Sequence, residues 1–113
     1  MVRIKRYCGR YLYEIENGKI REYCGGYLYE IKGNIIYRYL GRPLFEISGN
    51  QIKEYCGKYL LELDRGRVKR YCGNYIIEIS GNRIKEYCGS YLYEIEGNLS
   101  QDELMMLIAI LFA

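Results

Sequence analysis

A sixteen-residue segment, repeated six times, is the feature that most constrains how this chain can fold. It reads YCGRYLYEIENGKIRE at Tyr7 and returns as YCGGYLYEIKGNIIYR at Tyr23. The other copies begin at Tyr39, Tyr55, Tyr71 and Tyr87, and a half copy, Arg3 to Arg6, precedes the first. The third copy is the most diverged, with Leu40 in place of Cys and Pro43 in place of Tyr. Internal repeats at a fixed short period fix the class of architecture that a chain can adopt.

Each copy contains two turn signals. The first is Gly-Asn, at 33–34, 49–50, 81–82 and 97–98, and the second is Gly-x, at 9–10, 25–26, 41–42, 57–58, 73–74 and 89–90. Gly followed by a small polar residue is typical of a two-residue type II′ hairpin turn, whereas Asn17-Gly18 and the poorer Arg65-Gly66 are type I′ pairs. The six-residue segments between turns are rich in Tyr, Ile and Leu. The pattern predicts twelve short strands joined by tight hairpins.

The charges distinguish a hairpin meander from a stacked solenoid. In a solenoid the six repeated Glu would stack on one another at about 4.8 Å, and like charges placed so are destabilising. In a meander each Glu lies opposite a residue of the next strand. The expected pairs are Glu14–Arg21, Glu30–Tyr37, Glu46–Lys53, Glu62–Lys69 and Glu78–Lys85. The opposite charges favour the antiparallel meander.

The same register assigns the side chains to two faces. The outer face is expected to carry the Glu–Lys row and a Leu/Tyr row, the latter with Leu12, Leu28, Leu60, Tyr23, Tyr55 and Tyr71. The inner face carries the Ile row together with a Tyr/Cys row, and it is the apolar face to be buried. Its only charges alternate in sign on every other strand: Arg6, Glu22, Arg38, Glu54, Arg70 and Glu86. This alternation indicates pairs that lean across the aromatics between them, and a 32-residue superperiod.

The repeat stops after Gly97-Asn98, and a helix is predicted in its place. Ser100 and Glu103 form a capping box, with Asp102 also favourable at the positive end of the helix. The following LMMLIAILFA is apolar on all sides, which favours a buried helix over a surface or membrane helix. Its ten residues are about half of what a bilayer crossing needs. We therefore expect a single domain, 1–113, with hairpin repeats at 1–98 and a core helix at 99–113.

Dimensions support a sheet curled around this helix. Twelve strands about 4.8 Å apart span about 57 Å, which rolls into a radius of about 9–12 Å with room for one helix. Uniform two-residue turns give almost no register stagger, however, and barrels need shear. An open spiral and a prism of three four-stranded sheets therefore remain alternatives. In an open sheet, segments 3–7 and 91–96 would be free edges that permit end-to-end assembly.

The composition removes several classes of chemistry. There is no His, the commonest general base and metal ligand, and no nucleophile motif or phosphate-binding Gly loop. The repeated Glu offer six near-equivalent environments instead of one special site. We predict no enzyme, no cofactor, no metal site and no small-molecule substrate. The five Cys recur at sixteen or thirty-two residues, beyond disulfide reach on alternate strands, and are expected to be small buried apolar side chains. Without an export signal, the expected compartment is the cytoplasm.

A non-catalytic structural or protein-interaction module is the leading functional hypothesis. Exposed apolar and aromatic rows usually contact partners, and the partner is a protein or a second copy of the chain. The candidate partner surface consists of Tyr23, Leu28, Tyr55, Leu60, Tyr71 and Leu92. Two alternatives are single-stranded nucleic-acid binding through Tyr/Lys rows, which the interleaved Glu disfavour, and membrane association through the helix, which its length disfavours. The net charge of +3 is spread along the chain and demands no acidic partner.

Overall fold

The chain forms a closed barrel of twelve antiparallel strands in a computed structural model that describes residues 1–113. The strands are β1 (Val2–Arg6), β2 (Tyr11–Glu16), β3 (Lys19–Glu22), β4 (Tyr27–Lys32), β5 (Ile35–Arg38), β6 (Pro43–Ser48), β7 (Gln51–Glu54), β8 (Tyr59–Asp64), β9 (Arg67–Arg70), β10 (Tyr75–Ser80), β11 (Arg83–Glu86) and β12 (Tyr91–Glu96). Helix α1 (Gln101–Phe112) follows. The meander is confirmed, and it closes because β1 pairs with β12, Ile4 lying opposite Ile95. The barrel therefore has no free edges, and the open spiral and the prism are excluded.

The two-residue turns predicted at 33–34, 49–50, 81–82, 17–18 and 65–66 are confirmed. Gly33, Gly49 and Gly81 have φ near +60° while the Asn that follows each of them does not, as a type II′ turn requires. Asn17-Gly18 and Arg65-Gly66 both have positive φ at both residues, as in type I′ turns. These two-residue turns join β2 to β3 and each later equivalent pair. We call this end of the barrel the turn end.

The predicted Gly-x turns at the other end are wrong. The chain instead reverses in a three-residue loop, Tyr-Cys-Gly, in which Gly25 N–H donates to the Glu22 carbonyl at 2.9 Å and Glu22 N–H donates to the Gly26 carbonyl at 3.0 Å. The positive φ falls on Cys24, at +57°, and not on Gly25. Gly25 is needed for space, since a Cβ there would lie 2.9 Å from the Glu22 Cβ. We call these six reversals the Tyr-Cys-Gly loops, including the one in the third copy, where Leu40 replaces Cys. Their end of the barrel is the loop end.

A β-bulge follows every Tyr-Cys-Gly loop. Arg21 pairs with Tyr27, but Ile20 pairs with Tyr29, so Leu28 is an extra residue on β4. The same irregularity recurs in all six repeats. A one-residue insertion moves the side chains beyond it to the opposite face of the sheet. The residues between the bulge and the loop therefore lie on the face opposite to the one that uniform pairing predicts.

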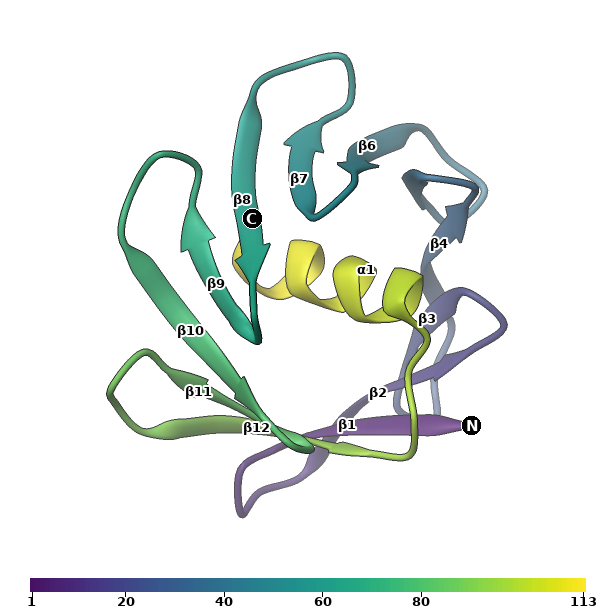
Figure 1. Ribbon diagram of the computed structural model, residues 1–113. Coiled ribbons are helices and arrows are strands. Elements are labelled where there is room, and N and C mark those ends of the chain that lie inside the picture. Colours follow the sequence, from purple (N-terminus) through teal and green to yellow (C-terminus); the bar gives the residue numbers. More distant parts are fainter.

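The loop and the bulge together supply the register stagger that uniform two-residue turns lack. Ile4 pairs with Tyr13, and Tyr13 pairs with Glu22, which is two residues beyond Ile20, the repeat equivalent of Ile4. Six repeats of two residues each give a shear of about twelve for twelve strands, which corresponds to a strand tilt of about 35° and is normal for a barrel. Figure 1 shows the resulting ring, with the hairpins β7–β8, β9–β10 and β11–β12 pointing outward and α1 lying across the interior.

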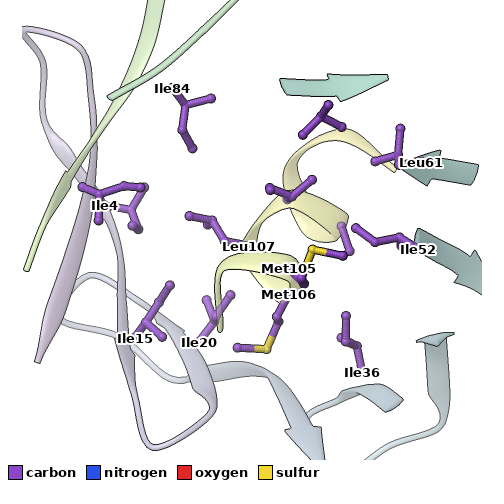
Figure 2. Packing of buried hydrophobic residues seen from close by; sticks show 14 of the residues in the cluster. Ile4, Ile15, Ile20, Ile36, Ile52, Leu61, Ile84, Met105, Met106 and Leu107 are labelled. Atoms are coloured by element: carbon purple, nitrogen blue, oxygen red, sulfur yellow. The ribbon is translucent and has the colours of Figure 1, made fainter. Parts of the chain in front are cut away.

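Helix α1 fills the barrel, as predicted. Its residues from Met105 to Ala109 are all buried, at no more than 1% exposure. They belong to one cluster of 17 buried apolar residues with the inward Ile row of the strands, and Figure 2 shows Ile4, Ile20, Ile36, Ile52 and Ile84 around Met105, Met106 and Leu107. The capping box is present in full, both bonds between Ser100 and Glu103 being 3.2 Å long. The second Glu103 oxygen accepts from Gly18 N–H at 3.0 Å, which fixes the helix start to the β2–β3 turn.

A substitution in the helix tests whether it is the core of the domain. We expect Leu107→Ala to lower the free energy of unfolding by about 2–5 kcal/mol, because a fully buried Leu leaves a cavity in a closed barrel. Leu111→Ala is the matched control, since Leu111 is only half-buried and should cost clearly less. Urea denaturation measures both. Equal, small losses from the two substitutions would contradict a core role for the helix.

Candidate functional site

A belt of paired tyrosines, in three stacked and two tilted pairs, runs around the outside of the barrel at the loop end. The pairs are Tyr7–Tyr91, Tyr11–Tyr23, Tyr27–Tyr39, Tyr59–Tyr71 and Tyr75–Tyr87, with ring centroids 4.9–5.2 Å apart. Each pair joins two neighbouring repeats. Tyr23, the first residue of its loop, packs against Tyr11, the first residue of β2, and the other pairs follow the same rule. The Tyr7–Tyr91 pair joins the first repeat to the last. We call these ten residues the tyrosine belt. Seven of the ten residues are 38–47% exposed, and Tyr11, Tyr39 and Tyr75 are half-buried.

The bulge puts the belt on the outer face. Tyr11, Tyr27, Tyr59, Tyr75 and Tyr91 were expected inside with the Cys, and that expectation is wrong. Their rings lie instead beside outward-facing cations: Lys5 Nζ is 5.6 Å from the Tyr11 centroid, and Lys53 Nζ is 5.5 Å from the Tyr59 centroid. In each copy the extra residue of the bulge lies between this Tyr and the core-facing residues of the same strand. Uniform alternation does not count the extra residue, so it assigns the Tyr to the inner face.

The six residues of the candidate partner surface separate into two groups. Tyr23, Tyr55 and Tyr71 are exposed on the outer face at 40–44%. Leu28, Leu60 and Leu92 are the extra residues of the bulges and are half-buried, and the latter two pack against the core cluster. The structure therefore brings the three Tyr to one surface and withdraws the three Leu from it. The belt Tyr that follow the loops lie beside these three Tyr, although uniform alternation does not predict them on this surface.

The belt has one break, in the third copy. Pro43 occupies the position at which a Tyr would stack on Tyr55, and a surface hollow lies there, lined by Arg42, Pro43, Leu44, Phe45, Glu54, Tyr55, Cys56 and Gly57. The preceding loop carries Leu40, which is 86% exposed with φ at +54°. The signal for this break is visible in the sequence, since both residues depart from the repeat.

The predicted Glu–Lys ladder runs around the barrel beside the belt. Glu14 lies 2.7 Å from Arg21, and Glu46, Glu62 and Glu78 lie 3.7–4.0 Å from Lys53, Lys69 and Lys85. Glu30 is paired with Tyr37, as expected. Closure extends the ladder to Lys5 and Glu94, at 3.9 Å. Most outward cations near the belt thus have a carboxylate partner.

Glu14 is the one buried charged residue, at 5% exposure. Its burial raises the pKa of the carboxyl, but hydrogen bonds and charges from Arg21 and Arg3 outweigh this, and the pKa lies below its ordinary value. Two belt hydroxyls also donate to carboxylates, Tyr11 to Glu96 and Tyr75 to Asp64, both at 2.8 Å, and these bonds raise the pKa of both phenols.

The five cysteines are exposed, which contradicts the expectation that they are buried. Cys8, Cys24, Cys56, Cys72 and Cys88 are the central residues of Tyr-Cys-Gly loops, with φ between +52° and +57°. The loop, not a strand, holds the Cys position, so the side chain points away from the core. Leu40 shares this conformation, so its substitution for Cys does not indicate a space-filling role.

No protein-family model, no curated protein and no solved structure matches this chain. No three His, Cys, Asp or Glu side chains are grouped as a metal would require. None of its helices has the length and apolar character of a membrane span.

Exposure of the five thiols can be measured directly. We expect the native protein to consume five equivalents of a thiol reagent such as an aromatic disulfide, at rates within a few-fold of those in urea, because no loop has to open first. Absorbance of the released thiolate gives count and rate. A native count below five, or reaction only after unfolding, would show that the loops are not placed as described.

The ion pairs of Glu14 predict a specific acid sensitivity. Since its folded pKa is lowered, the stability it contributes is present above the unfolded pKa of about 4.3 and is lost as the pH falls through the folded value. Glu14→Gln should therefore be less stable than the wild type at pH 6 and should lose less on acidification below about pH 4. Urea denaturation across pH measures this, with Glu16→Gln, an exposed residue outside the ion pairs, as control. Parallel curves for wild type and Glu14→Gln would contradict the prediction.

Proposed function

We propose that this chain is a non-catalytic interaction module that binds a protein partner through the tyrosine belt. The observation that carries the proposal is the band of five Tyr pairs around one closed barrel, three of them stacked and two tilted, with most of their Tyr exposed. Tyr offers a large amphipathic contact area with few rotatable bonds, which is why it is enriched at protein interfaces. The stacks hold the rings in place before binding, so that little side-chain entropy is lost in the complex.

The geometry supports a protein partner over the two alternatives. A single-stranded nucleic acid stacks its bases on free aromatic faces, whereas each belt ring already has a neighbouring ring at about 5 Å. The cations beside the rings are held by the Glu ladder, whose carboxylates would repel phosphate. Membrane association would require the apolar helix to leave the barrel, where Met105 to Ala109 are enclosed.

A site-directed crosslink tests the proposal. A variant with Cys72 as its only cysteine places a thiol beside Tyr71 of the belt, and a benzophenone maleimide on it should capture a protein in extracts of the source cells. The matched control carries the same probe on Lys32→Cys in a cysteine-free chain, at the turn end, and should capture nothing comparable. Adding Tyr59→Ser and Tyr71→Ser to the Cys72 variant should reduce capture at least several-fold.

Three outcomes would count against the proposal. Equal capture from both ends would show non-specific contact, and capture unaffected by the two Ser substitutions would exclude the belt. Capture that disappears after nuclease treatment, with affinity for an oligonucleotide that falls steeply with salt, would assign the surface to nucleic acid.

A further inference from the structure

A second surface, on the inner side of the hairpins at the loop end, carries a ring of charges. Each Tyr-Cys-Gly loop is preceded by one charged residue, the last of its strand, and the sign alternates around the barrel. The six are Arg6, Glu22, Arg38, Glu54, Arg70 and Glu86, and all are exposed. They face inward because they pair with the core-facing residues of the neighbouring strands, as Glu22 does with Tyr13. We call them the alternating ring.

The alternating ring has no charge partner within the chain. None of its members takes part in an ion pair, so the expected pairing across the aromatics is wrong. Successive members are two strands apart, about 10 Å, and the hairpins diverge toward their tips (Figure 1). Only Arg38 has a neighbour of note, the Tyr29 ring at 5.8 Å. Charge attraction inside one barrel therefore does not account for the alternation.

The alternation is a departure from the repeat. A sixteen-residue repeat would give all six positions one residue type, as it does for the outward Glu at 14, 30, 46, 62, 78 and 94. The ring instead follows a period of thirty-two residues. The sequence therefore specifies alternating charge at this position of the repeat. The position lies at the loop-end opening of the barrel.

The opening inside the ring is apolar and only half covered. Tyr13, Tyr29, Phe45 and Tyr93 line it from the strands, and Leu111 and Phe112 approach from the end of α1; all six are half-buried. Tyr93 and Phe112 meet edge to face at 6.3 Å. An apolar centre within a charged rim is the usual composition of a protein interface.

We propose that two copies of this chain associate face to face through their loop ends, ring against ring. The two copies are related by a two-fold axis that is perpendicular to the barrel axis and passes between two neighbouring hairpins. This axis makes the hairpins of the second copy run in the opposite order around the ring. Every Arg of one ring then faces a Glu of the other, and all six contacts are of opposite sign. The interface is isologous and closed, so it forms a dimer and not a filament.

The size of the surface suits a stable dimer. The molecule measures 37 × 34 × 17 Å, so the outline of its broad face encloses roughly 1,000 Å², which leaves room for the about 800 Å² that each partner buries in a standard interface. The tyrosine belt lies on the outer side of the same hairpins and stays accessible. The dimer therefore goes beyond the proposed function, and each can fail without the other.

Charge reversal gives a two-part test of the dimer. Glu22→Lys, Glu54→Lys and Glu86→Lys together make the ring wholly positive, and Arg6→Glu, Arg38→Glu and Arg70→Glu together make it wholly negative. Sedimentation equilibrium at about 50 mM salt should find the wild type dimeric at micromolar concentration, and each variant alone monomeric, with Kd weakened at least 100-fold. An equimolar mixture of the two variants should form a heterodimer.

The outcomes decide the proposal in both directions. Lys32→Glu with Arg65→Glu, which reverses two exposed cations at the turn end, is the control and should dimerise like the wild type. Thermal unfolding verifies that each variant folds. Folding is expected for the two ring variants because their charges are exposed and form no ion pairs, and for the control because Lys32 and Arg65 are exposed. A monomeric wild type at 100 μM, self-association of either single-sign variant, or failure of the mixture to associate would overturn the face-to-face dimer.

Discussion

The register offset at the Tyr-Cys-Gly loops is the constraint on which the rest of the structure depends. Without it, twelve equal strands joined by two-residue turns would have almost no shear and could not close at a normal tilt. The loop pairs Glu22 with Gly26, whereas a two-residue turn at 25–26 would have paired Cys24 with Tyr27. The bulge at Leu28 then shifts the pairing again. Closure then joins β1 to β12 and creates the only volume in which an apolar helix without a polar face can be buried.

This offset is obtained with a strained residue. A left-handed conformation costs a non-glycine residue about 1–2 kcal/mol, and the chain accepts it six times, at five Cys and at Leu40. Glycine would relieve the strain there, but glycine stands one position later, where the Cβ of the preceding Glu or Arg leaves no room for a side chain. The repeat keeps an exposed thiol at five of the six strained positions, although nothing in the packing requires sulfur.

Much of the fold could be predicted from the sequence, because the evidence for it is local. The Gly-Asn turns, the capping box of Ser100 and the ladder pair Glu14–Arg21 each follow from residues a few positions apart. The loop end could not, because Tyr-Cys-Gly contains no residue that normally adopts positive φ except Gly, and the structure gives that φ to Cys24. Because the sequence pattern predicts the reversal at Gly-x instead, it assigns Tyr27 and its equivalents to the inner face and the cysteines to the core. The tyrosine belt is therefore not predicted. The missing shear was the available signal, since a closed barrel cannot be made from uniform two-residue turns.

The two faces of the hairpins follow different rules, and this difference separates their roles. The outer face is nearly uniform, with the same Tyr pair and the same Glu in almost every copy, so a partner bound there, as proposed, would meet equivalent contacts around the barrel except at Pro43. The inner rim alternates in sign, and an alternating ring complements itself when its order is reversed. Uniformity suits recognition of a different molecule, because every copy contributes the same chemistry. Alternation suits recognition of an identical molecule, because like charges placed face to face would repel. A single sixteen-residue repeat can thus specify two kinds of contact, provided that one position follows a period twice as long as the others.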